Sequence, residues 1–258
     1  MELGPGRRTA LVLGGGGGLG GAIATTLARE GAAIAVVYID REAARARASD
    51  ITGQGGRAFP LQWDLYDLSV IPERVDAVGA TLGPVDILIG ITGGPPPTPT
   101  SGQSPALWTK HFGAMVLSVI AITDHLLPGT RHRGWGRIIT STSSGVVAPI
   151  PNLGLSNALR LSLLGWSKTL ARAVAKDGVT ANVLVSGRID TACVRSLDEQ
   201  KAKREERSPT DVSAESAASI SMGRYGDPQE YAEVATFLAS DRASYVTGTV
   251  VRVDGRLI

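Results

Sequence analysis

Short apolar runs alternate with longer segments of helical period along most of the chain. Runs that are apolar throughout are typical of strands buried on both faces of a parallel sheet, and the longer segments between them are typical of crossover helices. The pattern therefore predicts an α/β fold, a doubly wound parallel sheet of about seven strands. We expect strands at 9–13, 34–39, 57–63, 85–91, 137–141, 180–185 and 249–253, and helices at 20–30, 43–52, 71–82, 106–127, 155–175 and 231–240.

Prolines and charges predict where this alternation is interrupted. Pro95–Pro99 cannot form a helix or an inner strand and is expected to be a loop, and Pro128 is expected to end the helix that begins at residue 106. The segment 191–222 is charged and lacks an apolar stripe, which favours a mobile flap over a site, with a surface excursion as the alternative. No repeat or linker divides the chain, so residues 1–258 are expected to form one domain.

Composition restricts the partners of this domain. A single cysteine and three histidines without ligand spacing predict no metal site. The net charge is only +2, and the basic cluster at 131–137 lacks interleaved aromatic residues, so we expect a solvated loop there and no nucleic-acid partner. No apolar run has the length of a membrane span and the N-terminus lacks a signal pattern, so we expect a cytoplasmic protein without a membrane partner.

A run of glycines links the first predicted strand to the first predicted helix. Residues 14–18 are all glycine and are followed by Leu19 and Gly20. Glycine permits a sharp turn and close approach of a pyrophosphate, and the N-terminus of the next helix offers unpaired N–H groups and a partial positive charge. The position of this run predicts a phosphate-binding turn.

The pattern Gly14-x-x-x-Gly18-Leu19-Gly20 resembles the cofactor motif of the short-chain dehydrogenase/reductase family, and the resemblance runs from Thr9 to Gly255. It implies a Rossmann-type domain that binds a nicotinamide dinucleotide, acts on a small-molecule substrate and forms dimers or tetramers through its two long helices. In that family an acid contacts the adenine, where this chain has Asp64-Leu65, and a segment like Gly187-x-Ile189-x-Thr191 contacts the nicotinamide amide and the pyrophosphate. The cofactor-binding residues implied are Gly14, Gly18, Leu19, Gly20, Tyr38, Arg41, Asp64, Leu65, Gly93, Arg160, Gly187, Ile189 and Thr191.

The end of the second strand bears on the choice of cofactor. Family members that use NAD place an acid there to bind the ribose hydroxyls, whereas this chain has Tyr38, followed by Asp40 and Arg41. Arg41 is suited to pair with a 2′-phosphate, and Asp40 is the alternative ligand for a free ribose. We therefore expect NADP as the cofactor, with NAD as the alternative.

The catalytic positions depart from the family pattern. The family uses a serine, a tyrosine, a lysine four residues later and an asparagine on the preceding helix; the matching positions here are Ser143, Ser156, Arg160 and Met115. An aliphatic hydroxyl is a far weaker acid than a phenol, and arginine does not release its proton. We expect an oxidoreductase with an altered proton donor, in which Ser143 and Ser156 donate hydrogen bonds to the substrate oxygen and Arg160 is an electrostatic clamp.

Other interpretations remain open from the sequence. The chain is alternatively an inactive dinucleotide-binding sensor or partner, or a lyase, dehydratase or isomerase that uses the same pocket. Arg188 and Asp190 are further candidates for proton transfer or anion binding, against solvated loop charges as the alternative. His111 lies one turn before Met115, and we expect it to be a packed helix residue.

Overall fold

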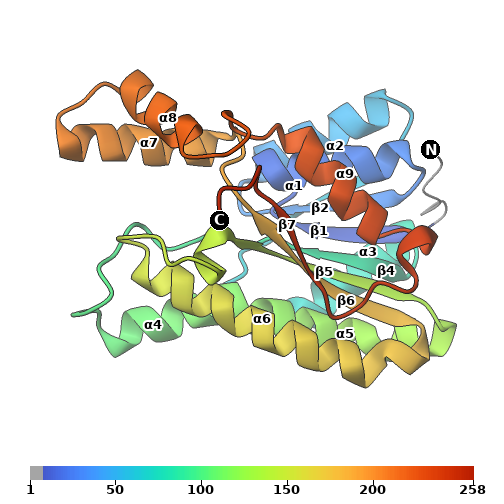
Figure 1. Cartoon of the computed structure of the whole chain (residues 1–258). Coiled ribbons are helices and arrows are strands. Elements are labelled where there is room, and N and C mark those ends of the chain that lie inside the picture. Colours follow the sequence, from blue (N-terminus) through green and yellow to red (C-terminus); the bar gives the residue numbers. More distant parts are fainter. Residues whose placement is uncertain (1–7) are drawn as a thin grey trace.

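The computed structural model describes residues 8–258 and contains a parallel sheet of seven strands in the order β3-β2-β1-β4-β5-β6-β7 (Figure 1). The strands are β1 (Thr9–Leu13), β2 (Ala33–Tyr38), β3 (Arg57–Gln62), β4 (Val85–Gly90), β5 (Gly136–Ser143), β6 (Val179–Ser186) and β7 (Val250–Val253). Each predicted strand is present, with bounds that differ by at most two residues, and the doubly wound α/β fold is confirmed.

Helices cover both faces of the sheet and create two separate cores (Figure 1). One face carries α1 (Gly18–Arg29), α2 (Arg41–Gly53) and α9 (Pro228–Leu238), and the other carries α3 (Ile71–Leu82), α5 (Ser118–Arg133) and α6 (Gly154–Val174). Along β1, Ala10 and Val12 join the first core, whereas Leu11 and Leu13 join the second. This alternation explains why the strand is apolar at successive positions.

The predicted helix at 106–127 is present, but it contains a π-helical turn that was not predicted, and its predicted end is wrong. The structure has α4 (Pro105–Phe112), a π-helical turn at Gly113–Leu117, and α5, which continues through Pro128 to Arg133. Pro128 and Asp124, whose carbonyl lies four residues earlier, are both exposed. Water can therefore satisfy the carbonyl that proline leaves without a donor. The helix ends instead at Gly134, which adopts the left-handed conformation with φ 63°.

The helical run at 105–133 is long and apolar enough, by length and composition alone, to cross a membrane. Its residues Val119, Ile122 and Leu126 are buried against the sheet. These contacts are those of a core helix in a globular domain.

The basic cluster at 131–137 is not the solvated loop expected from the sequence. Arg133 ends α5 and its Nε lies 3.0 Å from Oδ1 of Asp86. Arg137 is the second residue of β5, and only 2% of its surface is exposed. The Arg137 guanidinium donates to the carbonyl oxygens of Ser240 and Gly178. Arg133 thus links the end of α5 to β4, and Arg137 links β5 to the backbone before β6 and after α9.

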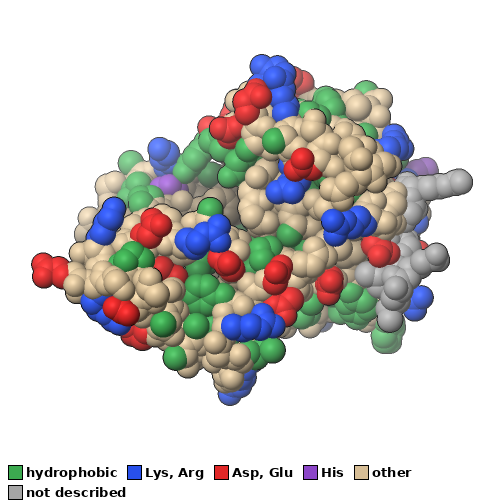
Figure 2. All heavy atoms as spheres, turned by 90° about the horizontal axis from the view of Figure 1, so that it is seen from above, with side chains coloured by type: hydrophobic (Ala, Val, Ile, Leu, Met, Phe, Trp, Pro, Cys, Tyr) green, Lys and Arg blue, Asp and Glu red, His purple; other side chains and the backbone are tan. Residues whose placement is uncertain are grey.

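The surface charges are mixed in sign. On the face shown in Figure 2, basic and acidic side chains are interspersed.

The charged segment at 191–222 forms two helices, α7 (Ala192–Glu205) and α8 (Pro209–Ala218), which project beyond the sheet (Figure 1). Side-chain caps start both helices, because Thr191 accepts from the Val194 N–H and Ser208 accepts from the Asp211 N–H. The α7–α8 hairpin lies beside the carboxyl ends of the strands. The strand order reverses between β1 and β4, and α/β sheets bind ligands at the carboxyl ends of the strands where such a reversal occurs.

Candidate functional site

The turn after β1 has the geometry of a phosphate cradle. Gly14 has φ +70°, and a Cβ added to Gly20 would lie 2.2 Å from the Gly14 carbonyl oxygen, so these two positions require glycine. No side chain caps the N-terminus of α1, and its first turn contains no acidic residue. The N–H groups of Gly18, Leu19 and Gly20 therefore face the end of the sheet with the positive end of the helix dipole. A diphosphate fits this turn.

A cavity of about 250 Å³ opens beside the glycine turn. Five residues predicted as cofactor ligands lie on its wall: Gly14, Tyr38, Asp64, Leu65 and Gly93. They come from the carboxyl ends of β1, β2, β3 and β4, which meet at one edge of the sheet. The other walls include Trp63, Ile91 and Met115 and are largely apolar. A flat aromatic base suits this cavity better than a charged group would.

Tyr38, which ends β2, and the two charged residues that follow the strand make different contacts. The ring of Tyr38 packs on the glycine turn, where a Cβ added to Gly16 would lie 2.7 Å from ring atoms. Asp40 caps α2, because its Oδ1 accepts from the Ala43 N–H at 2.8 Å. Arg41 is exposed in the first turn of α2 and forms no ion pair within residues 8–258. The carboxylate is thus engaged, and the guanidinium is available.

Ser156 and Arg160 lie one turn apart on α6. The Arg160 Nε donates to the Ser156 Oγ at 3.3 Å, and its Nη2 donates to the carbonyl oxygens of Thr92 and Gly93 at 3.3 and 3.2 Å. Burial lowers the pKa of the Arg160 guanidinium, which nevertheless stays protonated at neutral pH. Arg160 therefore joins α6 to the end of β4 beside the cavity. The sequence did not show that two backbone carbonyls would hold it.

Ser143 ends β5 and lies near a residue that the sequence analysis did not single out. A Cβ added to Gly145 would lie 3.4 Å from the Ser143 Oγ and 2.3 Å from the Asn157 Oδ1, so both oxygens flank this glycine. The Asn157 Nδ2 donates to the Ile150 carbonyl oxygen, while its Oδ1 is buried without a partner among the described residues. In the sequence, only the position of Asn157 directly after Ser156 indicated that it could lie in the site.

The predicted loop at 95–99 covers the start of α6. The Thr98 N–H donates to the Asn152 carbonyl oxygen at 2.7 Å, and the Gly154 N–H donates to the Thr98 carbonyl oxygen at 3.1 Å. Gly154 is the first residue of α6, two positions before Ser156. The proline-rich loop is therefore fixed next to the predicted catalytic serine.

The segment after β6 approaches the glycine turn from the other side. Gly18 lies so close to Thr191 that a Cβ added to this glycine would be 2.8 Å from the Thr191 Cγ2. The start of α7 therefore contacts the start of α1. The Gly187 backbone packs closely against Asp254, and the Ile189 side chain is 3% exposed in the core. Of these predicted ligands, Thr191 and the backbone of Ile189 remain available to a cofactor, whereas the Gly187 N–H donates to the Val253 carbonyl oxygen at 3.0 Å.

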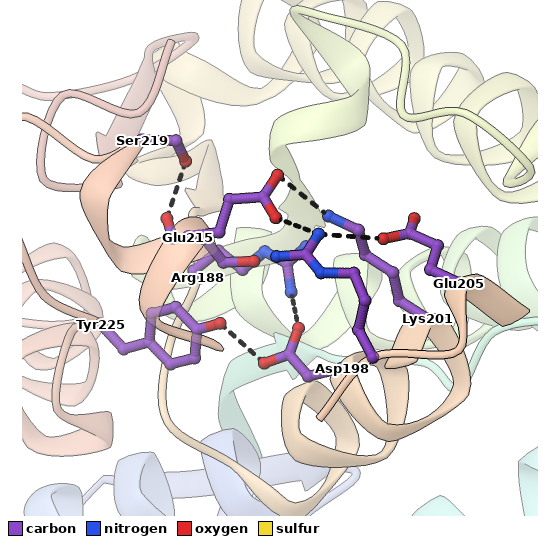
Figure 3. A network of polar contacts seen from close by, with 9 residues as sticks. Arg188, Asp198, Lys201, Glu205, Glu215, Ser219 and Tyr225 are labelled. Atoms are coloured by element: carbon purple, nitrogen blue, oxygen red, sulfur yellow. Dashed lines mark hydrogen bonds and ion pairs between the residues drawn. The ribbon is translucent and has the colours of Figure 1, made fainter. Parts of the chain in front are cut away.

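Arg188 and Asp190 form ion pairs on this segment. The Arg188 Nη1 lies 2.6 Å from Oδ1 of the buried Asp198 in α7, and the Tyr225 hydroxyl donates to Oδ2 of Asp198 at 2.7 Å (Figure 3). Asp190 pairs with Arg195. Arg188 is thus neither a free anion ligand nor a solvated loop charge, and it anchors α7 to the loop after β6.

His111, at the end of α4, is 7% exposed, as expected for a packed helix residue. Its Nδ1 lies 3.0 Å from the Tyr66 hydroxyl oxygen. Burial and the nearby Lys110 lower the pKa of His111, and burial and Asp64 raise the pKa of Tyr66. Both side chains are therefore neutral at pH 7, and one hydrogen bond joins them, donated either by the phenol to Nδ1 or by an Nδ1–H to the phenol oxygen.

Comparisons with known proteins agree with this architecture. The family profile described as "Enoyl-(Acyl carrier protein) reductase" matches residues 15–256. An acetoacetyl-CoA reductase of Rhizobium meliloti (strain 1021) is 32% identical over 250 residues, which are 96% of this chain and 97% of the relative. The 3-oxoacyl-[acyl-carrier-protein] reductase FabG of Escherichia coli (strain K12) is 33% identical over 250 residues, 96% of each chain.

A solved structure extends the likeness to three dimensions. The crystal structure of L-sorbose reductase from Gluconobacter frateurii, complexed with NADPH and L-sorbose, has a TM-score of 0.93 at 27% identity and covers 100% of this chain and 98% of its own. The match spans the glycine turn, the cavity and α6. This chain belongs to the short-chain dehydrogenase/reductase family.

Proposed function

We propose that this protein is an NADP(H)-dependent oxidoreductase that interconverts a carbonyl group and an alcohol on a small-molecule substrate. The observation that carries the proposal is the uncapped N-terminus of α1 at the glycine turn, open beside a cavity at the reversal point of the sheet. The L-sorbose reductase structure contains NADPH, which supports the same cofactor class here.

Tyr38 at the end of β2 and the residues that follow it favour NADP(H) over NAD(H). Tyr38 provides no carboxylate to accept hydrogen bonds from ribose hydroxyls, and the Asp40 carboxylate caps α2. Arg41 is exposed and unpaired within the described residues, so it is suited to a bidentate contact with a 2′-phosphate. We expect Arg41→Ala to weaken NADPH binding about tenfold and to leave NADH binding nearly unchanged.

The reduced cofactor would supply a hydride to the carbonyl carbon. The residues of this chain must then stabilise the oxygen and deliver a proton to it. Since the Ser156 Oγ accepts a hydrogen bond from the Arg160 Nε, its own O–H is free to donate to a substrate oxygen. The Arg160 cation stabilises negative charge on that oxygen and on Ser156, and Ser143 is the second donor. Ser156 and Arg160 would thus replace the tyrosine and lysine of the family.

The helices α7 and α8 lie beside the glycine turn and the loop after β6. Thr191 touches Gly18, and Arg188 anchors α7 through Asp198. We propose that residues 191–222 cover the substrate as a preformed helical lid. The fixed loop at 95–99 would form the opposite wall.

Binding is tested first, by titration calorimetry with NADPH, NADH and their oxidised forms. A ligand at a hundred times its Kd raises the free energy of unfolding by about 2.7 kcal/mol, so thermal shift provides a second readout. We expect micromolar binding of NADPH and weaker binding of NADH. Failure of all four dinucleotides to bind at millimolar concentration would overturn the proposal.

Turnover is tested by the absorbance of NADPH against a panel of ketones and aldehydes. We expect Ser156→Ala and Ser143→Ala each to lower kcat about a hundredfold without weakening NADPH binding. Ser162→Ala, on the same helix, is the matched control. Binding without any oxidation of NADPH would favour a sensor, and conversion of a substrate without oxidation of NADPH would favour a lyase, dehydratase or isomerase.

A further inference from the structure

A tyrosine–histidine pair lies at the rim of the cavity beside the glycine turn, outside the residues implied by the family pattern. Tyr66 follows Asp64 and Leu65, the predicted adenine contacts, in the loop after β3, and His111 is the penultimate residue of α4. Both side chains line the cavity. The pair therefore brings a polar group to a cavity whose other side walls are largely apolar.

The geometry fixes the orientation of the imidazole. The Tyr66 hydroxyl is 3.0 Å from Nδ1, and the two rings meet edge to face with centroids 6.0 Å apart. Nε2 has no hydrogen-bond partner among residues 8–258, although it is not a fully buried atom. When the phenol donates to Nδ1, the Nε2 of this buried ring carries the imidazole proton and is available as a donor.

The cavity suggests what this donor contacts. Trp63, Leu65 and Met115 provide apolar surface, and the cavity adjoins the phosphate turn at Gly14. A purine attached through ribose to a diphosphate on that turn would occupy this space. Adenine carries ring nitrogens that accept hydrogen bonds, and a neutral imidazole N–H is a suitable donor to one of them.

We propose that His111, oriented by Tyr66, recognises the adenine base of the cofactor by donating a hydrogen bond from Nε2 to one of its ring nitrogens. This inference rests on the proposed dinucleotide function. It adds His111 as a specificity-determining residue and Tyr66 as its positioning residue. The cation of Lys110, whose Nζ lies 5.2 Å from the centre of the Tyr66 ring, further fixes the tyrosine.

The test measures recognition of the adenine base alone. It uses nucleotides that lack the nicotinamide half of the cofactor and compares analogues on the same folded protein. Adenosine 5′-monophosphate and its 1-deaza, 3-deaza and 7-deaza analogues, each lacking one ring nitrogen, are titrated against the wild-type protein and His111→Val. We expect one analogue to bind the wild-type protein about five- to tenfold more weakly than the parent nucleotide. The His111→Val variant should bind that analogue and the parent equally.

Three further variants complete the experiment. His111→Gln retains an N–H donor and should recover part of the selectivity, and Tyr66→Phe should reduce it without abolishing it. His125→Val, at a half-exposed histidine on α5, should behave as wild type. If NADPH binds normally to wild type and to His111→Val, and the analogues show no difference between them, this inference is wrong while the proposed function stands. If no dinucleotide binds the wild type, both fail.

Discussion

At the residue scale, Tyr231 illustrates how a buried polar group is accommodated between α9 and the sheet. Its ring is fully buried, and its hydroxyl lies 2.7 Å from the Ser141 Oγ and 3.2 Å from the Leu184 carbonyl oxygen. Burial raises the pKa of the Tyr231 phenol far above its ordinary value of 10. The phenol is therefore neutral, and its hydrogen bonds join α9 to β5 and β6.

We predict that Tyr231→Phe lowers the free energy of unfolding by about 1–2 kcal/mol, because the Ser141 hydroxyl then loses its buried partner. Urea unfolding followed by circular dichroism measures the change. Ser141→Ala alone should cost a similar amount, and the double variant should cost less than the sum of both. Additive losses would show that the two hydroxyls do not interact.

The candidate site was partly predictable from single residues. The glycine turn, Tyr38, Asp64 and Gly93 could be placed because each lies at the end of a recognisable strand or within three residues after it. The bonds from Arg160 to the carbonyls of Thr92 and Gly93 could not, since backbone carbonyls have no sequence signature and their direction depends on how β4 and α6 pack. The contact of His111 with Tyr66, 45 positions apart in the chain, was hidden for the same reason.

At the element scale, the start of α9 depends on a reciprocal cap. Asp227 accepts from the Gln229 N–H, Glu230 accepts from the Asp227 N–H at 2.7 Å, and Arg224 pairs with Glu230. These contacts lower the pKa of Glu230 to about 2 from an ordinary value of 4.5, the Arg224 hydrogen bond being the largest cause. Because the pKa of the folded state is the lower one, this stabilisation is complete above about pH 4.5 and is lost as the pH falls towards 2.

We predict that Glu230→Gln lowers the Tm at pH 7 and that the difference from wild type shrinks as the pH falls from 4.5 to 2. Scanning calorimetry at closely spaced pH values measures this difference. Glu233→Gln, an exposed glutamate on the same helix, should show a smaller and flatter difference. A Tm difference for Glu230→Gln that stays constant below pH 4.5 would contradict the assigned pairing.

The hairpin of α7 and α8 shows why charge patterns are hard to interpret from sequence. Its helices lack an apolar stripe, and each buries a single apolar side chain, Ala202 in α7 and Val212 in α8. Ion pairs also join the two helices, as in the contact of Glu215 with Lys201 (Figure 3). Ion pairs depend on the partner that the fold brings near, so no periodicity in the sequence indicates them. The same limit applies to the π-helical turn at Gly113–Leu117, which divides a segment of otherwise continuous helical period.

We predict that Asp198→Asn loosens this hairpin. Removing the carboxylate leaves Arg188 without its partner and weakens the contact with the Tyr225 hydroxyl, at a local cost of about 2–3 kcal/mol. Hydrogen exchange should accelerate in residues 192–218 and remain unchanged in β1 and β4. Glu199→Gln, at the adjacent exposed position, is the control. Equal protection in both variants would show that Asp198 does not anchor α7.

At the scale of the whole molecule, most of the fold was predictable from the sequence. Parallel strands buried on both faces produce apolar runs that local sequence shows clearly, and the helix at 71–82 was predicted with its observed bounds. Helix starts were less certain, since α2 begins at Arg41 behind the Asp40 cap and its first turn carries charge instead of an apolar stripe. What the sequence did not contain was the arrangement of side chains between elements.

The last prediction concerns assembly through the long helices, which the family resemblance implies. α4, α5 and α6 lie on one side of the sheet (Figure 1), and Leu161 on α6 is 49% exposed there. In a twofold dimer each substitution acts twice. Burying a leucine contributes about 1.5–3 kcal/mol per copy. Leu161→Glu should therefore raise the dimer dissociation constant at least a hundredfold. Sedimentation equilibrium measures the mass. Ala46→Glu, exposed on α2 across the sheet, should leave the assembly intact, and an equal mass for both variants would place the interface elsewhere.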